Sequence, residues 1–151
     1  MSHSSKPPEP PEPSEPTQLT RDRVAAAPVA RLATLRADGT PRMVPITFAV
    51  VDDVVCSAVD EVKPKRSTRL ARLDDVRRDP RVALLVDHYS DDWAALWWVR
   101  IDGTAAVHDD GELRDRALEA LAAKYPAYLA ARPSGVVLVI TPLRWAAWSA
   151  S

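Results

Sequence analysis

The chain has 151 residues, of which 46% are hydrophobic, and its formal net charge is −1 at pH 7. This length suits one domain with a single core, and the near-neutral charge gives no indication of a nucleic-acid-binding or membrane-surface protein. No apolar run approaches the roughly 18 residues of a transmembrane helix, no signal-peptide pattern opens the chain, and the single cysteine, Cys56, has no partner for an internal disulfide, so we expect a soluble cytoplasmic protein.

The first 17 residues, MSHSSKPPEPPEPSEPT, repeat Pro and Glu and contain no branched aliphatic or aromatic residue. Such a segment cannot bury enough apolar surface to offset the entropy lost on ordering, so residues 1–17 are predicted to be a disordered tail. A linker and a recruitment arm in polyproline conformation are the two roles open to it. The folded domain is expected over residues 18–151.

The first half of the domain is predicted to be rich in strands. The expected elements are a short helix and three strands, at residues 21–27, 29–36, 42–51 and 54–59. Asp38 and Gly39 separate the first two strands and favour a type I′ hairpin, and Asp52 with Asp53 marks the next turn. Connections this short predict an antiparallel meander.

The second half alternates helices with strands. The expected elements are a helix, two strands, a second helix and two final strands, at residues 67–79, 81–88, 95–107, 112–124, 135–141 and 144–149. Ser67 or Thr68 is expected to cap the first of these helices, and Pro80 to end it. Pro142 is expected to separate the last two strands. About seven strands and three helices predict a mainly β fold with α, in the α+β class.

Charge is segregated along the chain. Residues 63–81 carry a net charge of +5, whereas residues 82–112 hold seven acids and one arginine. The basic residues begin before the helix and enter its first turn, where unpaired N–H groups and the helix dipole favour an anion. Four residues are therefore candidates for binding a phosphate-bearing cofactor: Lys63, Lys65, Arg66 and Thr68. Arginines further along the helix fit the alternative, a solvated basic face: Arg72, Arg77 and Arg78.

Pro45 lies inside the expected strand 42–51, where it cannot donate a ladder hydrogen bond and marks an edge or a bulge. Such a site leaves neighbouring backbone groups free. The residues after it form an apolar wall with one hydroxyl, and the strand 54–59 is expected to lie opposite. A flat heteroaromatic ring bound there would contact four candidate residues: Pro45, Ile46, Thr47 and Ser57.

The sequence contains no Gly-rich phosphate loop, no GxSxG elbow and no HExxH motif. The three histidines are far apart, and His88 and His108 suit surface or capping roles near strand ends. No catalytic residue or metal ligand is assigned, and Cys56 is expected to be a small buried strand residue. Trp97 and Trp98 are adjacent in an expected strand and face opposite ways, so one of them is expected to meet a partner subunit or a ligand.

Three segments, in this order, resemble the split-barrel proteins related to pyridoxamine 5′-phosphate oxidase, especially the branch that uses coenzyme F420: ARLATLRADGTPRMVPITF, KPKRSTRLARLDDVRRDPRVALLVDHY and WWVRIDGTA. The likeness runs from about residue 24 to residue 149. It implies a split β-barrel of the FMN-binding type that forms a homodimer, with the cofactor in a groove at the subunit interface. The implied ring position is the strand of Pro45, Ile46 and Thr47, and the implied phosphate position is near Lys63, Lys65 and Arg66.

The resemblance also implies an oxidoreductase whose cofactor carries the hydride chemistry while the protein binds and orients it. Reduced F420 would donate hydride to a small electrophilic substrate such as a quinone, a conjugated enone or a tetrapyrrole. FMN is the alternative cofactor, as in the oxidase branch, and a non-catalytic carrier or sensor would use the same groove. The partners expected are this small molecule and a second copy of the chain, with neither nucleic acid nor membrane.

Overall fold

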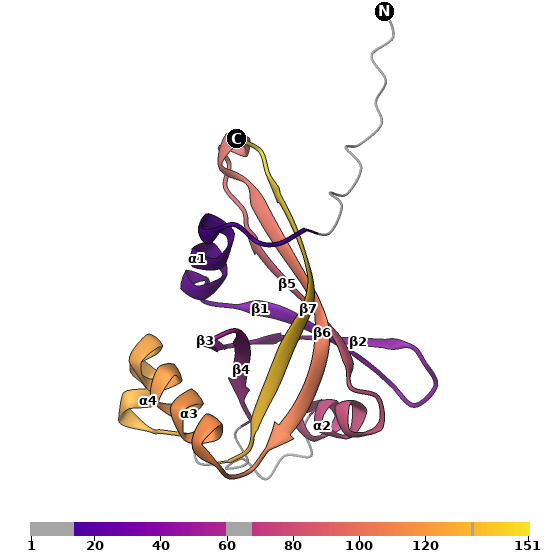
Figure 1. Cartoon of the computed structure of the whole chain (residues 1–151). Coiled ribbons are helices and arrows are strands. Elements are labelled where there is room, and N and C mark those ends of the chain that lie inside the picture. The colour runs from indigo at the N-terminus through magenta and orange to yellow at the C-terminus, as the bar shows by residue number, and fades with distance from the viewer. Residues whose placement is uncertain (1–13, 60–67, 134) are drawn as a thin grey trace, which may run out of the picture.

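A computed structural model of the chain describes residues 14–59, 68–133 and 135–151. In this part, seven strands form one antiparallel sheet in the order β2-β1-β5-β6-β7-β4-β3 (Figure 1). The strands are β1 Ala30–Leu35, β2 Pro41–Ile46, β3 Ala49–Val51, β4 Val54–Ala58, β5 Arg81–His88, β6 Trp97–His108 and β7 Val137–Ser149. The helices are α1 Gln18–Ala26, α2 Thr68–Arg78, α3 Glu112–Lys124 and α4 Pro126–Ala130, with a 3₁₀ turn at Trp93–Ala95. The predicted fold class is confirmed.

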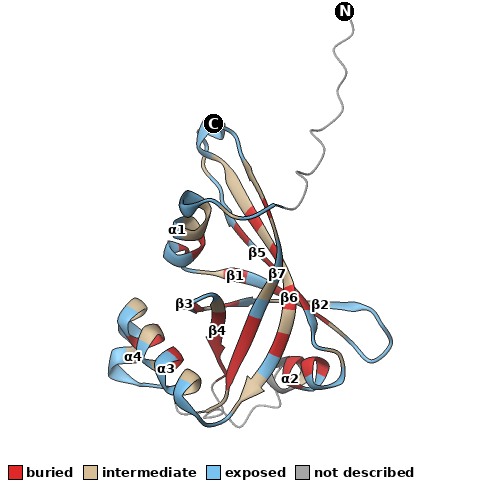
Figure 2. Ribbon diagram, viewed as in Figure 1, coloured by how far each residue is buried: buried red, intermediate tan, exposed pale blue. Residues whose placement is uncertain are grey.

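The sheet curls into a barrel that closes at one corner. Its two edge strands, β2 and β3, follow each other in the chain and are joined by Thr47 and Phe48. The prediction of one strand over residues 42–51 is therefore wrong, because the chain must leave one edge of the sheet and enter the other. Phe48 is 0% exposed and fills the interior beneath the corner. Figure 2 shows buried residues along the strands that enclose this interior.

The β1–β2 hairpin has a different turn from the one expected. Gly39 has a φ of 84°, but Asp38 is not in the left-handed region that a type I′ turn requires at both central residues. The loop instead closes through the Gly39 N–H to the Arg36 C=O at 2.9 Å and the Arg36 N–H to the Thr40 C=O at 2.8 Å. The Asp38 carboxylate accepts from the Thr40 N–H at 3.0 Å, so the aspartate stabilises a longer loop.

Strand β7 is continuous, and the prediction of two strands separated by Pro142 is wrong. It pairs with β6 along its whole length, with a register shift between Asp102 and Gly103, where Gly103 faces Pro142. Strand β4 pairs with β7 only over Val137–Ile140, so Pro142 costs no ladder bond on that side. Beyond the shift, β6 and β7 extend out of the barrel as a long arm with β5 (Figure 1).

The predicted tail overlaps the folded part at its last four residues. The Ser14 N–H donates to the Trp145 C=O at 3.0 Å, and the Thr17 hydroxyl caps α1 by accepting from the Thr20 N–H at 3.1 Å. Helix α1 buries Val24 in the core, so residues 14–17 are attached to the folded domain through α1 and β7. Residues 1–13 lie outside the described part of the chain.

Helices α3 and α4 pack against the β3 and β4 side of the barrel. Pro126 does interrupt the predicted helix, but it also begins α4 as its first residue. Cys56 lies in the small apolar cluster under α3, and burial raises the pKa of its thiol to about 11. Its predicted role as a small buried strand residue is confirmed. No helix of the described residues is both long and apolar enough to span a bilayer.

Candidate functional site

The corner between β2 and β3 brings together some of the predicted ring-binding residues. Pro45 is exposed on edge strand β2, Thr47 is half-buried, and Ile46 points its side chain into the core. Buried Ser57 on β4 donates its hydroxyl to the Thr47 C=O at 2.8 Å, so β4 contacts the corner, although it pairs with β3 and not with β2. The side chain of Ile46 is occupied by packing, which leaves Pro45 and Thr47 as the surface-facing part of the wall.

The backbone of the corner is held by side chains of α3 and α4. The Phe48 N–H donates to the Tyr125 hydroxyl at 3.1 Å, and Lys124 Nζ donates to the Phe48 C=O at 2.9 Å. The Thr47 and Tyr128 hydroxyls are hydrogen-bonded at 2.8 Å. Pro45 lies on an edge strand, as expected, whereas the backbone of Phe48, three residues further on, is occupied by these contacts. Sequence reasoning missed these three residues, although KYPAY places two phenols and an ammonium within five positions.

Lys124 is the titratable cation of this corner. Its Nζ lies 3.8 Å from the centre of the Phe48 ring and 5.2 Å from that of Tyr125. Burial lowers the pKa of the Lys124 ammonium to about 8, because a charged amine loses hydration there. A group with this pKa exchanges its proton close to neutral pH, and its Nζ is bonded to the backbone of Phe48, the residue after Thr47.

The predicted phosphate-binding residues fall mostly outside the described chain. Lys63, Lys65 and Arg66 lie in residues 60–67, which the structure does not describe. Thr68 is the first residue of α2, so the basic segment leads directly into the start of a helix, as expected. The alternative assignment of a solvated face fits Arg77, whose side chain is exposed, but not Arg72, which is buried.

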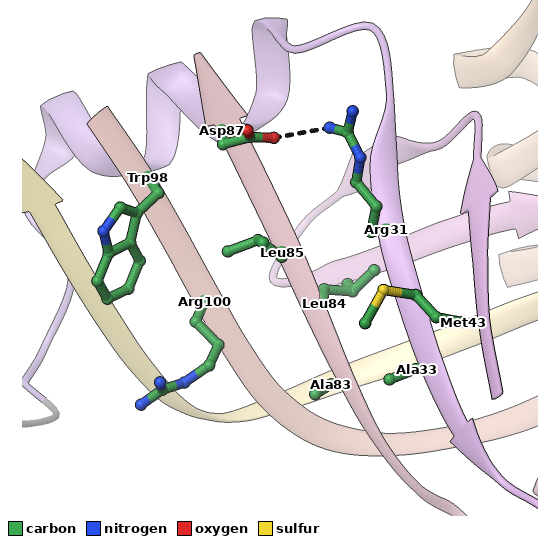
Figure 3. A pocket seen from close by; sticks show the side chains of 9 residues that line it. All are labelled: Arg31, Ala33, Met43, Ala83, Leu84, Leu85, Asp87, Trp98 and Arg100. Atoms are coloured by element: carbon green, nitrogen blue, oxygen red, sulfur yellow. Dashed lines mark hydrogen bonds and ion pairs between the residues drawn. The ribbon is translucent and has the colours of Figure 1, made fainter. Parts of the chain in front are cut away.

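A hollow of about 450 Å³ lies on the outer face of the sheet, away from the core (Figure 3). Its floor and sides are mostly apolar, with an ion pair of 2.6 Å between Arg31 and Asp87 at one end. The lining residues come from β2, β1, β5 and β6: Arg31, Ala33, Met43, Ala83, Leu84, Leu85, Asp87, Trp98 and Arg100. Sequence reasoning did not single out this surface.

Strand register explains the hollow. Ala33 pairs with both Met43 and Ala83, so two small side chains stand side by side between larger ones. Two residues further along the strands, the next row contains Arg31, Leu85 and Arg100. Met43 is 66% exposed and Leu85 37% exposed, although both are large apolar residues. An apolar depression of this kind on a sheet face is typical of an interaction surface.

The two adjacent tryptophans face opposite ways, as predicted. Trp97 packs at the edge of the main core, where Arg23 lies 5.3 Å from its ring and His88 stacks on it at 6.1 Å. Trp98 lines the outer hollow. Within the described residues, no group of three or more His, Cys, Asp or Glu side chains is arranged to hold a metal ion.

The curled seven-stranded sheet with its closing corner defines the split-barrel class. A family model for pyridoxamine 5′-phosphate oxidase matches residues 16–149, and the chain belongs to this family. No curated protein was found that matches the chain in sequence.

Solved structures with the same fold include proteins of several descriptions. A conserved hypothetical protein from Mycobacterium tuberculosis is 21% identical with a TM-score of 0.74, over 91% of this chain and 87% of that one. A FAD-binding protein from Mesorhizobium loti is 23% identical with a TM-score of 0.62, over 84% and 87%. A heme binding protein from Mycobacterium smegmatis is 21% identical with a TM-score of 0.67, over 87% and 54%. At these identities the likeness shows the fold alone.

Proposed function

We propose that the protein is an F420-dependent oxidoreductase that transfers a hydride from the reduced deazaflavin to a small electrophilic organic molecule. The observation that carries the proposal is the corner at Pro45 and Thr47, at the end of an edge strand, in a family whose members use flavin-type cofactors. The basic segment of Lys63, Lys65 and Arg66 before α2 supports a phosphate-bearing cofactor. The sequence resemblance to the F420 branch favours this cofactor over FMN.

The residues present fit such a group. Strand β2 has a strand neighbour on only one side among the described residues, so its other edge can face a planar ring. Ser57 donates a hydrogen bond to the Thr47 carbonyl, and Tyr128 is hydrogen-bonded to the Thr47 hydroxyl. Thr47 is therefore held in place before any ligand binds. When bound, the cofactor supplies the hydride, and the protein binds and orients it. Lys124, close to this wall, is the described group best suited to hold or release a proton there.

We also propose that the protein is a homodimer that uses the outer hollow as its interface. The exposed side chains of Met43 and Leu85, together with Trp98, form an apolar surface that a second copy would cover. Pro45 lies on the same outer face, in register with Arg31. Packing two copies here would therefore place the ring wall at the edge of the interface, where a groove between subunits could enclose the cofactor.

The cofactor is tested by absorption titration of the purified protein with F420 and with FMN, followed by turnover with quinones, conjugated enones and tetrapyrroles. We expect F420 to bind more tightly and to be reoxidised by at least one acceptor. Tighter binding of FMN with turnover would support the oxidase-like alternative, and tight binding without turnover would support a carrier. Haemin is included because one protein of this fold binds heme. Binding of haemin alone would contradict the proposal.

The phosphate site is tested by Lys63→Ala and Lys65→Ala. Each is expected to weaken F420 binding by about tenfold to a hundredfold, since a charge-assisted hydrogen bond contributes roughly 1.5–3 kcal/mol. Arg77→Ala is the control, because Arg77 lies late in α2 and is 3.9 Å from Asp74 in an exposed pair. Titration at two salt concentrations separates the electrostatic part. Small and equal effects at all three positions would contradict this phosphate site.

The interface is tested by light scattering on Leu85→Arg. The substitution is expected to convert the dimer to a monomer, because the new guanidinium would stand between Arg31 and Arg100 in the same row and could not be buried there without a large cost. Leu129→Arg is the control, since Leu129 is an exposed leucine on α4, outside the hollow. A monomeric wild-type protein, or a dimeric Leu85→Arg variant, would refute this interface.

A further inference from the structure

The hydroxyl of the ring wall, which consists of Pro45 and Thr47, is bonded to a phenol. Thr47 Oγ1 lies 2.8 Å from the Tyr128 Oη on α4. Both side chains are half-buried, and neither hydroxyl has another hydrogen-bond partner among the described residues. A hydroxyl group has one proton to donate and can also accept. The single bond between them therefore leaves each hydroxyl with unused hydrogen-bonding capacity.

The backbone of the corner is held without the Tyr128 contact. Ser57 donates to the Thr47 C=O at 2.8 Å. Lys124 Nζ donates to the C=O of Phe48, the next residue, at 2.9 Å. Tyr128, in contrast, is bonded only to the side chain of Thr47. Its effect is therefore on the hydroxyl, because it fixes where the oxygen points and which of its hydrogen-bonding positions is used.

The chemistry of the two hydroxyls decides which one donates. A phenol is a stronger acid than an aliphatic alcohol and a weaker acceptor, because its oxygen lone pair is delocalised into the ring. The Tyr128 hydroxyl therefore donates to Thr47 Oγ1, and Thr47 keeps its own O–H. Accepting a hydrogen bond polarises that O–H and strengthens it as a donor. The result is an oriented donor at the ring wall.

Thr47 is the candidate ring-binding residue whose side chain has a donor to spare. Pro45 and Ile46 have no side-chain donor. The Ser57 hydroxyl already donates to the Thr47 C=O. Flavin and deazaflavin rings both have carbonyl oxygens on the edge of the ring, and such oxygens accept hydrogen bonds. A few placed polar groups on a mostly apolar wall are what fix the orientation of a bound ligand.

We propose that the Thr47 hydroxyl donates a hydrogen bond to a carbonyl oxygen of the bound flavin-type ring, and that Tyr128 is the positioning residue that orients this hydroxyl. The inference rests on the proposed function. Thr47 contacts the ring, whereas Tyr128 acts only through Thr47. The effects of removing the two hydroxyls should therefore be non-additive.

The test is absorption titration of the wild-type protein and its variants with F420 and with FMN. Thr47→Val removes the donor and is expected to weaken binding of the preferred ring by about threefold to tenfold, the range for one neutral hydrogen bond. Tyr128→Phe is expected to weaken it by about threefold, the lower end of that range, because the donor remains but is no longer oriented. In the Thr47→Val background, Tyr128→Phe should have no further effect.

The spectrum of the bound ring gives a second measurement. A hydrogen bond to a ring carbonyl changes the absorption band of the ring, so Thr47→Val and Tyr128→Phe should both shift the bound band in the same direction. Thr47→Ser keeps the hydroxyl and should retain the wild-type band and affinity. Tyr89→Phe is the control, because Tyr89 is 69% exposed and its hydroxyl has no partner among the described residues.

Each result has a distinct meaning. If Tyr128→Phe leaves binding unchanged, or weakens it equally with and without the Thr47 hydroxyl, Tyr128 has only a structural role and the inference is overturned. Unchanged binding in Thr47→Val would overturn it as well. If wild-type protein binds neither F420 nor FMN, the proposed function fails and the inference with it. Should Thr47→Val not fold, Thr47→Ala removes the same hydroxyl and replaces it in every comparison.

Discussion

Gly103 stands at the point where the β6–β7 ladder changes register, and we predict that Gly103→Ala destabilises the protein strongly. A Cβ at this position would lie 2.3 Å from the Thr141 carbonyl oxygen and 3.3 Å from the Pro142 Cα. Both are backbone atoms, so the clash cannot be relieved by turning a side chain. Forcing extra atoms into a packed site costs about 1–3 kcal/mol, and an immovable contact belongs at the upper end, about 3 kcal/mol. For a chain of this size that is roughly 6–12 °C in Tm.

The measurement is urea and thermal unfolding of Gly103→Ala at one fixed protein concentration, with Gly39→Ala as the control. A Cβ added at Gly39 would have no atom within 4 Å, but Gly39 has a φ of 84°, so its substitution costs only backbone strain. Left-handed strain of about 1–2 kcal/mol is partly offset by the lower entropy of the unfolded chain, which leaves about 1 kcal/mol. A loss at Gly103 no larger than that at Gly39 would refute the steric argument.

Further predictions concern Lys124, Cys56 and the N-terminal segment. Because the pKa of Lys124 is lowered to about 8, the unfolded chain binds more protons than the folded one above pH 8, so Lys124 makes the unfolding free energy rise with pH. Unfolding of wild type and Lys124→Met between pH 7.5 and 9 should show that rise in the wild type alone, and parallel curves would contradict it. Cys56, which is buried with a raised pKa, should react with a disulfide reagent far more slowly in buffer than in urea. Fast labelling of folded protein would argue against its burial. Deleting residues 1–13 should leave Tm unchanged, whereas deleting residues 1–17 removes the Thr17 cap and should cost about 1 kcal/mol. Equal Tm values for the two truncations would mean that the cap contributes nothing.

Local patterns in the sequence were sufficient for most individual elements. The strand Arg81–His88 and the helix Glu112–Lys124 have the predicted bounds, because proline and glycine signals delimit each of them and their apolar spacing matches one period. The opposite orientations of Trp97 and Trp98 also follow from strand geometry alone. These features depend on residues close together in the chain.

The errors lie where distant residues decide the outcome. Pro142 predicts a strand break, but β7 continues through it. At Pro142 the strand pairs with β6 only, and no β4 residue on the other side requires a hydrogen bond from it. Residues 42–51 read as one strand, but the sheet closes on itself and turns Thr47 and Phe48 into a corner. The segment KYPAY gathers the phenols of Tyr125 and Tyr128 beside Lys124, but only the tertiary structure shows that they hold this corner.

By itself, the sequence determined the fold class, the order of the elements, the basic segment before α2 and the candidates for the ring wall. These depend on periodicity, turn residues and charge, which are properties of short stretches of the chain. Only the tertiary structure decided which of those candidates face outward, that Ile46 belongs to the core, and that Asp75 and Arg42 meet 33 positions apart. It also assembled the outer hollow, since Ala33, Met43 and Ala83 become neighbours only through strand register. Contacts between strands depend on how the whole sheet pairs and curls, and that is a property of the complete chain.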